Sequence, residues 1–201
     1  MPSLPSLTKS IAQSLLLAFC FRWTIRFCQI SSLTQTLRKN RRDDVRKFIV
    51  EATNAALNGI PAERVRFHTC YGINEGPRIY EANLPQIIEY ILKVNAGSFS
   101  FANPRREHEC HLFERVKLPD GKVLCPGVIT HASNIVEHPE WIAERLMRFA
   151  NLVGRENVMA GADCGFSSQA LYKTEVHPTV VWEKFKAMLE GADIASKRLW
   201  R

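Results

Sequence analysis

The chain has 201 residues, of which 46% are hydrophobic and 23% charged, so it is long enough for one domain with a sizeable core and short for two. The net charge of +7 is confined to residues 1–42, which carry seven basic residues and no acid, leaving 20 basic and 20 acidic residues in the rest. Because the remainder is neutral overall, we expect no basic face on the folded body and no nucleic-acid partner.

Residues 1–42 differ in composition from the rest of the chain. Their apolar run, 11–21, is shorter than the roughly 20 residues of a membrane-spanning helix, so we expect no stable membrane span. An acid-free, Arg- and Ser-rich start is typical of a mitochondrial transit peptide, and a poorly ordered basic extension is the other interpretation. We therefore divide the chain into an extension, 1–42, and a folded domain, 43–201. The six cysteines form no CxxC pair and favour a reducing compartment, the cytoplasm.

From residue 43 onward, helices and strands alternate. Hydrophobic spacing predicts helices at 45–56, 83–92, 139–153 and 178–192, and strands at 65–70, 98–102, 123–129 and 158–162. Four strand–helix units indicate a parallel α/β architecture. They correspond to half of an eight-stranded TIM barrel, whose usual length is about 250 residues, and a flavodoxin-like open sheet is the competing topology.

Three residues at predicted strand ends have side chains that bind metals. His68 and Cys70 are two apart in one strand and therefore project to the same side. Cys164 follows the fourth strand, and the carboxyl ends of parallel strands meet at one edge. One His with two Cys is a known ligand set of catalytic zinc, so we expect Zn²⁺ here. On spacing alone, ordinary buried cysteines and a core histidine are the alternative.

Four short stretches carry a resemblance to a known family: HTCYG at 68–72, SFSFANPR at 98–105, PGVI at 126–129 and ADCG at 162–165. With them, residues 43–200 resemble the carboxyl-terminal catalytic domain of the cobalamin-independent methionine synthase family. The stretches at 118–123 and 136–140 resemble the shorter, single-domain relatives. The HxC triplet with a distant DCG triplet is the most specific part of the pattern.

The resemblance implies a TIM-barrel domain, zinc, and an S-methyltransferase of methionine biosynthesis. Its expected partners are a homocysteine-like thiol as methyl acceptor and a folate-like methyl donor. The implied zinc ligands His68, Cys70 and Cys164 are present, but Ser100 stands where the family has a Glu ligand. The fourth ligand stays open between water and a residue of the following loop, for which the sequence offers Glu107, His108, Glu109 and Cys110.

Two further roles rest on the resemblance. Related enzymes have an Asp and a His just after the Gly-Val pair, where this chain has Thr130 and Ala132. His131, between them, is the nearest acid to protonate the leaving nitrogen, and an exposed loop histidine is the alternative. Asn103 and Arg105 are expected to bind the carboxylate or polyglutamate tail of the donor, with a solvated loop as the alternative.

Two other functions stay open. The first is a zinc enzyme that acts on a different thiol. The second is a truncated or degenerate barrel without catalysis, because four units do not close an eight-stranded barrel and the family's Glu and Asp positions are substituted. A homodimer would allow two chains to complete a barrel together.

Overall fold

The computed structural model describes residues 22–24, 39–69, 83–101, 107–166 and 176–201. These residues form a five-stranded sheet in which every neighbouring pair is parallel and the order follows the chain, β1-β2-β3-β4-β5. The strands are β1 (Arg22–Thr24), β2 (Arg66–Thr69), β3 (Ser98–Phe101), β4 (Val123–Ile129) and β5 (Gly161–Ala162).

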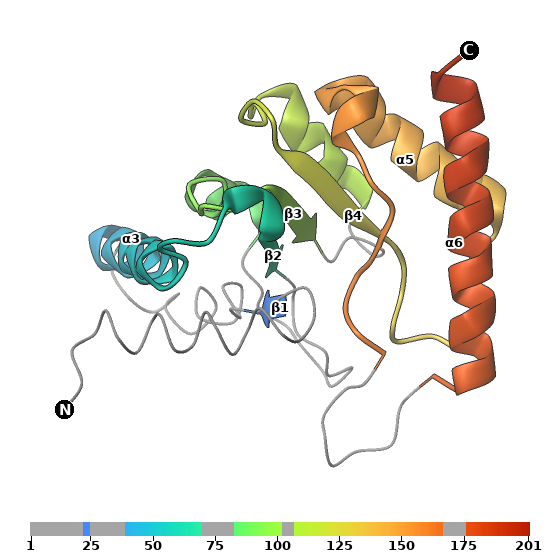
Figure 1. Ribbon diagram of the computed structural model, residues 1–201, viewed down its shortest axis with the longest axis horizontal. Helices are drawn as coiled ribbons and strands as arrows, with labels where there is room; N and C mark the ends of the chain where they lie inside the picture. Colours follow the sequence, from blue (N-terminus) through green and yellow to red (C-terminus); the bar gives the residue numbers. More distant parts are fainter. Residues whose placement is uncertain (1–21, 25–38, 70–82, 102–106, 167–175) are drawn as a thin grey trace.

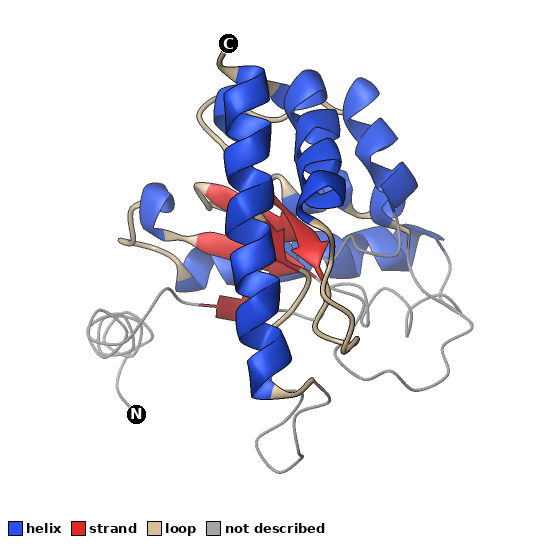
Figure 2. Cartoon of the chain, turned by 90° about the vertical axis from the view of Figure 1, so that its right-hand side faces the viewer, coloured by secondary structure: helices blue, strands red, loops and turns tan. Residues whose placement is uncertain are grey.

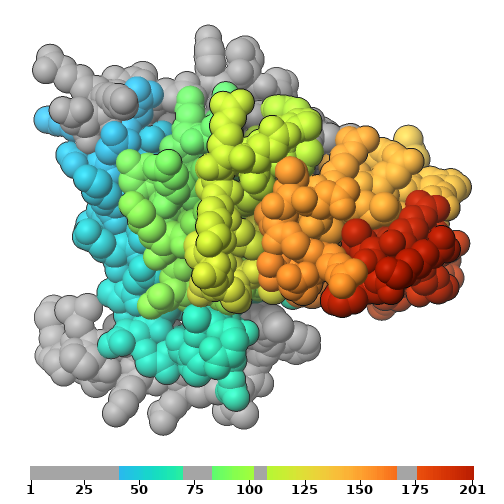
Figure 3. Space-filling view, turned by 90° about the horizontal axis from the view of Figure 1, so that it is seen from above, coloured from blue at the N-terminus to red at the C-terminus, as the bar shows by residue number. Residues whose placement is uncertain are grey.

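The helices alternate with the strands. The α-helices are α3 (Lys39–Ala56), α4 (Ile88–Ile91), α5 (Pro139–Val153) and α6 (Pro178–Leu199), and the 3-10 segments are η1 (Ala62–Arg64), η2 (Leu84–Gln86), η3 (Glu107–Glu114) and η4 (Arg155–Asn157). Successive units lie side by side across the molecule in chain order (Figure 3). The long helix α6 crosses the sheet in the view of Figure 2.

The predicted parallel α/β class is confirmed. The sequential strand order is that of a barrel-type winding and differs from the flavodoxin order, 2-1-3-4-5. The predicted helix 83–92 was wrong in form, because it is divided into η2 and α4; Pro85 lacks the N–H that a continuous helix needs. The predicted strand 158–162 is reduced to β5, with Val158 making only an isolated bridge to Leu124. The 3-10 segment η3 was missed.

The boundary at residue 42 does not coincide with an element boundary. Helix α3 begins at Lys39, and β1 lies inside the predicted extension, where it pairs with β2. Part of the extension therefore belongs to the sheet. In the described parts of the chain, no helix combines the length and the apolarity needed to cross a bilayer.

Two hydrophobic clusters cover the sheet. The larger one joins β2, β3 and the start of β4 to residues of α4 and η3, including Phe67, Ile87, Phe99 and Phe113. The second joins the end of β4 to α5 and α6 through Val128, Ile142, Leu146 and Ala187. Contacts with the helices therefore hold the strands in place, and polar residues are found at the carboxyl ends of the strands.

Helices α5 and α6 begin with the same capping arrangement. His138 and His177 each precede a proline, and each ring Nδ1 accepts the backbone N–H of the second residue beyond it, from Glu140 and Thr179 at 3.2 Å. Both histidines are thus N-cap residues of helices that begin with a proline. Neither imidazole is therefore a candidate for the site.

Gly191 allows α6 to approach α5 closely. A Cβ atom at this position would lie 2.6 Å from the Cβ of Ile142 and 2.8 Å from the carbonyl oxygen of Pro139. Glycine in a helix interior costs about 1 kcal/mol relative to alanine, so its presence here is explained by the close helix contact.

We predict that Gly191→Ala destabilises the protein, since overpacking costs about 1–3 kcal/mol and outweighs the gain of about 1 kcal/mol in helix propensity. Urea unfolding monitored by circular dichroism measures the change. The control is Glu190→Ala, an exposed position on the same helix, which should change the free energy of unfolding by less than about 0.5 kcal/mol. A Gly191→Ala variant as stable as the wild type would contradict this packing.

Candidate metal and catalytic site

Several buried polar residues lie close together at the carboxyl edge of the sheet. His68 and Ser100 are direct partners in the β2–β3 register, so their side chains emerge on the same side. Thr130 and His131 follow the last residue of β4, and Asp163 with Cys164 follows the last residue of β5. His68, Ser100, His131, Asp163 and Cys164 are all buried.

His68 and Cys164 meet although 96 positions separate them in sequence: the thiol Sγ lies 3.7 Å from the ring Nε2. Two ligands of one tetrahedral zinc, with bonds of about 2.3 Å to sulfur and about 2.0–2.1 Å to nitrogen, are separated by about 3.6 Å. The two side chains therefore have the spacing of a shared metal ion. A direct thiol–imidazole hydrogen bond has a similar length, so this distance alone does not require a metal.

The other ring nitrogen of His68 is also occupied. Its Nδ1 lies 3.0 Å from Ser100 Oγ, and His68 is only 1% exposed. Both ring nitrogens therefore have partners, which fixes the ring plane. A histidine held in this way is typical of metal sites, where the nitrogen that does not bind the metal has a hydrogen-bond partner.

Asp163 holds the ends of β4 and β5 together. Its Oδ1 accepts the backbone N–H groups of His131 at 2.8 Å and Cys164 at 2.7 Å, and lies 2.9 Å from His131 Nδ1. Its Oδ2 accepts the hydroxyl of Thr130 at 3.0 Å. With four such contacts, Asp163 positions its neighbours, and it holds His131 and Cys164 at one carboxylate oxygen.

The charge of Asp163 is stabilised in place. Burial alone would raise the pKa of this carboxyl, but the hydrogen bonds and charge of His131, with the hydroxyl of Thr130, outweigh burial and lower the pKa below its ordinary value. Asp163 is therefore ionised at neutral pH and acts as a hydrogen-bond acceptor for His131.

Gly127 makes room for this carboxylate. A Cβ atom on Gly127 would lie 2.7 Å from the Cα and 2.8 Å from the backbone nitrogen of Asp163. The glycine of the PGVI stretch thus permits the close approach of β5 to β4, at a shift in register between Gly127 and Ile129.

A buried ion pair fixes the segment that follows β4. Lys184 of α6 is fully buried, and its Nζ contacts both carboxylate oxygens of Glu137 at 2.9 Å and the carbonyl oxygen of Ile135. Glu137 Oε1 also accepts the backbone N–H of Thr130 at 2.8 Å. The sequence analysis did not predict this pair. The available signal was a lysine on the apolar side of α6, three residues after Val181 and four before Met188.

The predicted site residues divide into two groups. The structure brings His68 and Cys164 together and places His131 beside them through Asp163; the alternative of an exposed loop histidine was wrong, because His131 is 5% exposed. Cys70, Asn103 and Arg105 lie outside the described residues.

The structure also bears on the fourth ligand. Within the described residues, no group of three or more His, Cys, Asp or Glu side chains is placed to hold a metal ion. Cys110 packs in the larger hydrophobic cluster, and burial raises the pKa of its thiol. It is therefore not gathered with His68 and Cys164.

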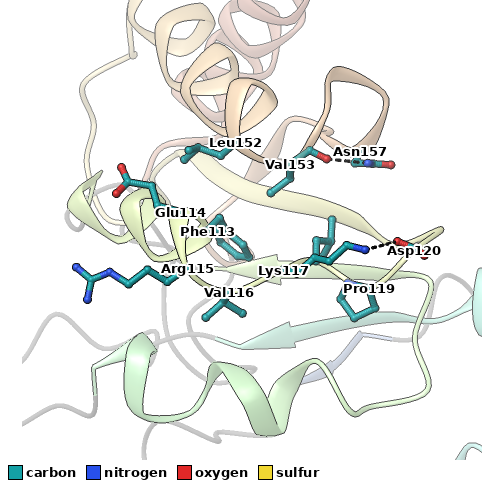
Figure 4. A pocket seen from close by; sticks show the side chains of 11 residues that line it. Phe113, Glu114, Arg115, Val116, Lys117, Pro119, Asp120, Leu152, Val153 and Asn157 are labelled. Carbon is teal, nitrogen blue, oxygen red and sulfur yellow. Dashed lines mark hydrogen bonds and ion pairs between the residues drawn. The ribbon is translucent and has the colours of Figure 1, made fainter.

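A pocket of about 340 Å³ lies elsewhere. It is lined by the segment that precedes β4, residues 113–120, by Leu152 and Val153 at the end of α5, and by Asn157 of η4 (Figure 4). These segments lead into the amino ends of β4 and β5, so the pocket is at the edge opposite Cys164. Its charged side chains include the exposed pair Lys117 and Asp120, 3.4 Å apart. We assign the chemistry to the carboxyl edge.

Comparison with known proteins gives a likeness of fold. No protein-family model and no curated protein sequence matches the chain. Among solved structures, the chain is similar to a B12-independent methionine synthase from Shewanella sp. W3-18-1, determined in complex with selenomethionine, with a TM-score of 0.61 and 23% sequence identity. The match covers 79% of this chain and 46% of that one, so this chain spans less than half the length of the similar protein.

We predict that Asp163→Asn lowers stability at pH 7 by about 1–3 kcal/mol, because it removes a buried charge-assisted acceptor. A depressed carboxyl pKa stabilises the fold above the unfolded-state value, 3.8, and this contribution disappears as the pH falls through the lower folded-state value. The loss of unfolding free energy in Asp163→Asn should therefore be full from pH 5 to 7 and become smaller below pH 3.8. Chemical denaturation of both proteins at several pH values measures it. A deficit that does not vary with pH would contradict the assignment.

Proposed function

We propose that the chain is a zinc-dependent S-methyltransferase of the methionine synthase type, which transfers a methyl group from a folate-like donor to a homocysteine-like thiol. The observation that carries the proposal is the 3.7 Å approach of Cys164 Sγ to His68 Nε2 at the carboxyl edge of a barrel-type sheet. The fold likeness and the HxC and DCG triplets support it. The match covers less than half of the similar protein, so the activity of that whole protein enters here only as part of the proposal.

In this proposal His68, Cys70 and Cys164 hold the zinc. His68 and Cys164 fit on geometry, and Cys70 is included because it follows His68 by two positions in sequence. Zinc bound there would supply the positive charge that lowers the pKa of a substrate thiol and keeps it as a thiolate at neutral pH. Asp163 holds the backbone of Cys164 in the required position through its 2.7 Å hydrogen bond.

His131 is proposed to give a proton to the nitrogen that the methyl group leaves. Asp163 accepts from the Nδ1 of His131, so the carboxylate orients the ring. What supports this role is that the buried Asp163–His131 pair adjoins Cys164, the proposed metal ligand. Asn103 and Arg105 are proposed to contact the donor's carboxylates, and location in the cytoplasm and a homodimer stay predictions.

We predict about one zinc per chain in freshly purified protein, with loss of zinc in His68→Gln and Cys164→Ser. Metal analysis by mass spectrometry gives the ratio. The matched control is Cys110→Ala, a buried thiol in the hydrophobic cluster, which should retain zinc. Folded wild-type protein without zinc, or equal zinc in the Cys164→Ser variant, would rule out this site.

We further predict that formation of methionine from homocysteine and a methyl-folate depends on His131. His131→Asn should lower kcat by about 10²–10⁴ while leaving bound zinc unchanged, as expected for loss of a general acid. Production of methionine, followed by chromatography, is the measurement. A zinc-loaded chain that methylates another thiol supports the second enzymatic interpretation, and one that methylates none supports a degenerate barrel.

A further inference from the structure

Ser100 occupies a position in the site to which the proposed function gives no role. It lies in β3, directly paired with His68 of β2, and is 7% exposed. Its hydroxyl oxygen is 3.0 Å from His68 Nδ1. A hydroxyl is a poor zinc ligand, so Ser100 needs a role other than binding the metal.

The partners of the His68 ring decide where its proton lies. The Cys164 thiol, 3.7 Å from Nε2, is able to donate to that nitrogen, which then acts as the acceptor. With the thiol as donor, the proton of His68 is on Nδ1 and is donated to Ser100 Oγ; the reverse arrangement, in which Ser100 donates to Nδ1 and Nε2 donates to the sulfur, fits the same two distances. The Nδ1–H tautomer satisfies both nitrogens and directs the Nε2 lone pair at Cys164.

The geometry also separates Ser100 from the coordination sphere. The lone-pair directions of the two imidazole nitrogens diverge by more than a right angle, and Ser100 lies at one nitrogen while Cys164 lies at the other. A metal ion between Nε2 and Sγ is therefore on the far side of the ring from Ser100 Oγ. The serine contacts the ligand and not the metal.

We propose that Ser100 is a positioning residue that fixes the tautomer and ring orientation of His68, so that the site binds zinc without any ligand from β3. The consequence for zinc rests on the proposed function; the tautomer of His68 does not. A position that a β3 carboxylate would fill is then left to a ligand from solution, either water or a substrate thiol. Ser100 is then a hydrogen-bond partner of a ligand and not itself a ligand.

The first experiment reads the tautomer in metal-free protein. Long-range ¹H–¹⁵N correlation spectra distinguish Nδ1–H from Nε2–H imidazole, and a His68→Asn variant identifies the His68 signals. We expect Nδ1–H in the wild type and in Ser100→Thr, which keeps a hydroxyl, and a mixture of tautomers in Ser100→Ala. Ser98→Ala, on the same strand and the same side two residues earlier, is the matched control and should resemble the wild type.

The second experiment measures zinc affinity by competition with a chromophoric chelator. Loss of a hydrogen-bond partner of a metal-binding histidine costs about 10–100-fold, so Ser100→Ala should bind zinc that much more weakly, while Ser98→Ala and Ser100→Thr bind nearly as the wild type does. With Co²⁺ in place of zinc, the visible bands of Ser100→Ala should keep their positions, because the coordination sphere is unchanged.

The outcomes separate the two proposals. An Nε2–H tautomer in the wild type, or unchanged zinc affinity in Ser100→Ala, overturns the role of Ser100. Co²⁺ bands that shift in Ser100→Ala also overturn it, since they make the serine a direct ligand. Folded wild-type protein that binds no zinc overturns the proposed function instead, and the tautomer spectra still decide whether Ser100 orients His68.

Discussion

The arrangement of the site depends on the carboxylate of Asp163. Strand β5 has two residues and makes few ladder hydrogen bonds of its own, so the segment that follows it needs another attachment to β4. Asp163 provides it by accepting the backbone N–H groups of His131 and Cys164 on one oxygen. Because the next residue is Cys164, the same carboxylate sets where the thiol points. Its desolvation is costly, and the four contacts that it accepts offset this cost.

The ion pair of Lys184 and Glu137 connects this arrangement to helix α6. Burying two charges gains little net stability, because desolvation cancels much of their attraction. Its effect here is one of position: Glu137 also accepts the N–H of Thr130, so α6 is attached to the segment that carries His131. Helix α6 therefore helps to hold the segment that carries His131 at the carboxyl edge, although α6 has no residue in the site.

The sequence predicted the features that depend on local pattern. Strand β4 and the starts of α5 and α6 follow from hydrophobic alternation and from prolines at helix starts, and the two-residue period in β2 placed His68 at the correct edge. Features that depend on tertiary contact were not predictable. The division of the 83–92 helix at Pro85 and the pairing of β1 with β2 are of this kind. So is the role of Asp163, which results from a β4–β5 approach that only Gly127 permits.

In the proposed zinc site, metal binding and turnover make different physical demands. Zinc held by one imidazole and two thiolates carries no net charge, whereas a further carboxylate would make the site anionic and would weaken its attraction for a thiolate from solution. A neutral site with a hydrogen-bonded His68 retains its attraction for sulfur. Transfer of a methyl group makes additional demands, since the donor must be held in line with that sulfur and its nitrogen protonated. His68, Ser100 and Cys164 lie together at the carboxyl edge, and His131, which follows β4, is held by Asp163, the residue before Cys164. A serine at position 100 is thus compatible with the proposed thiol site, because its hydroxyl contacts His68 there.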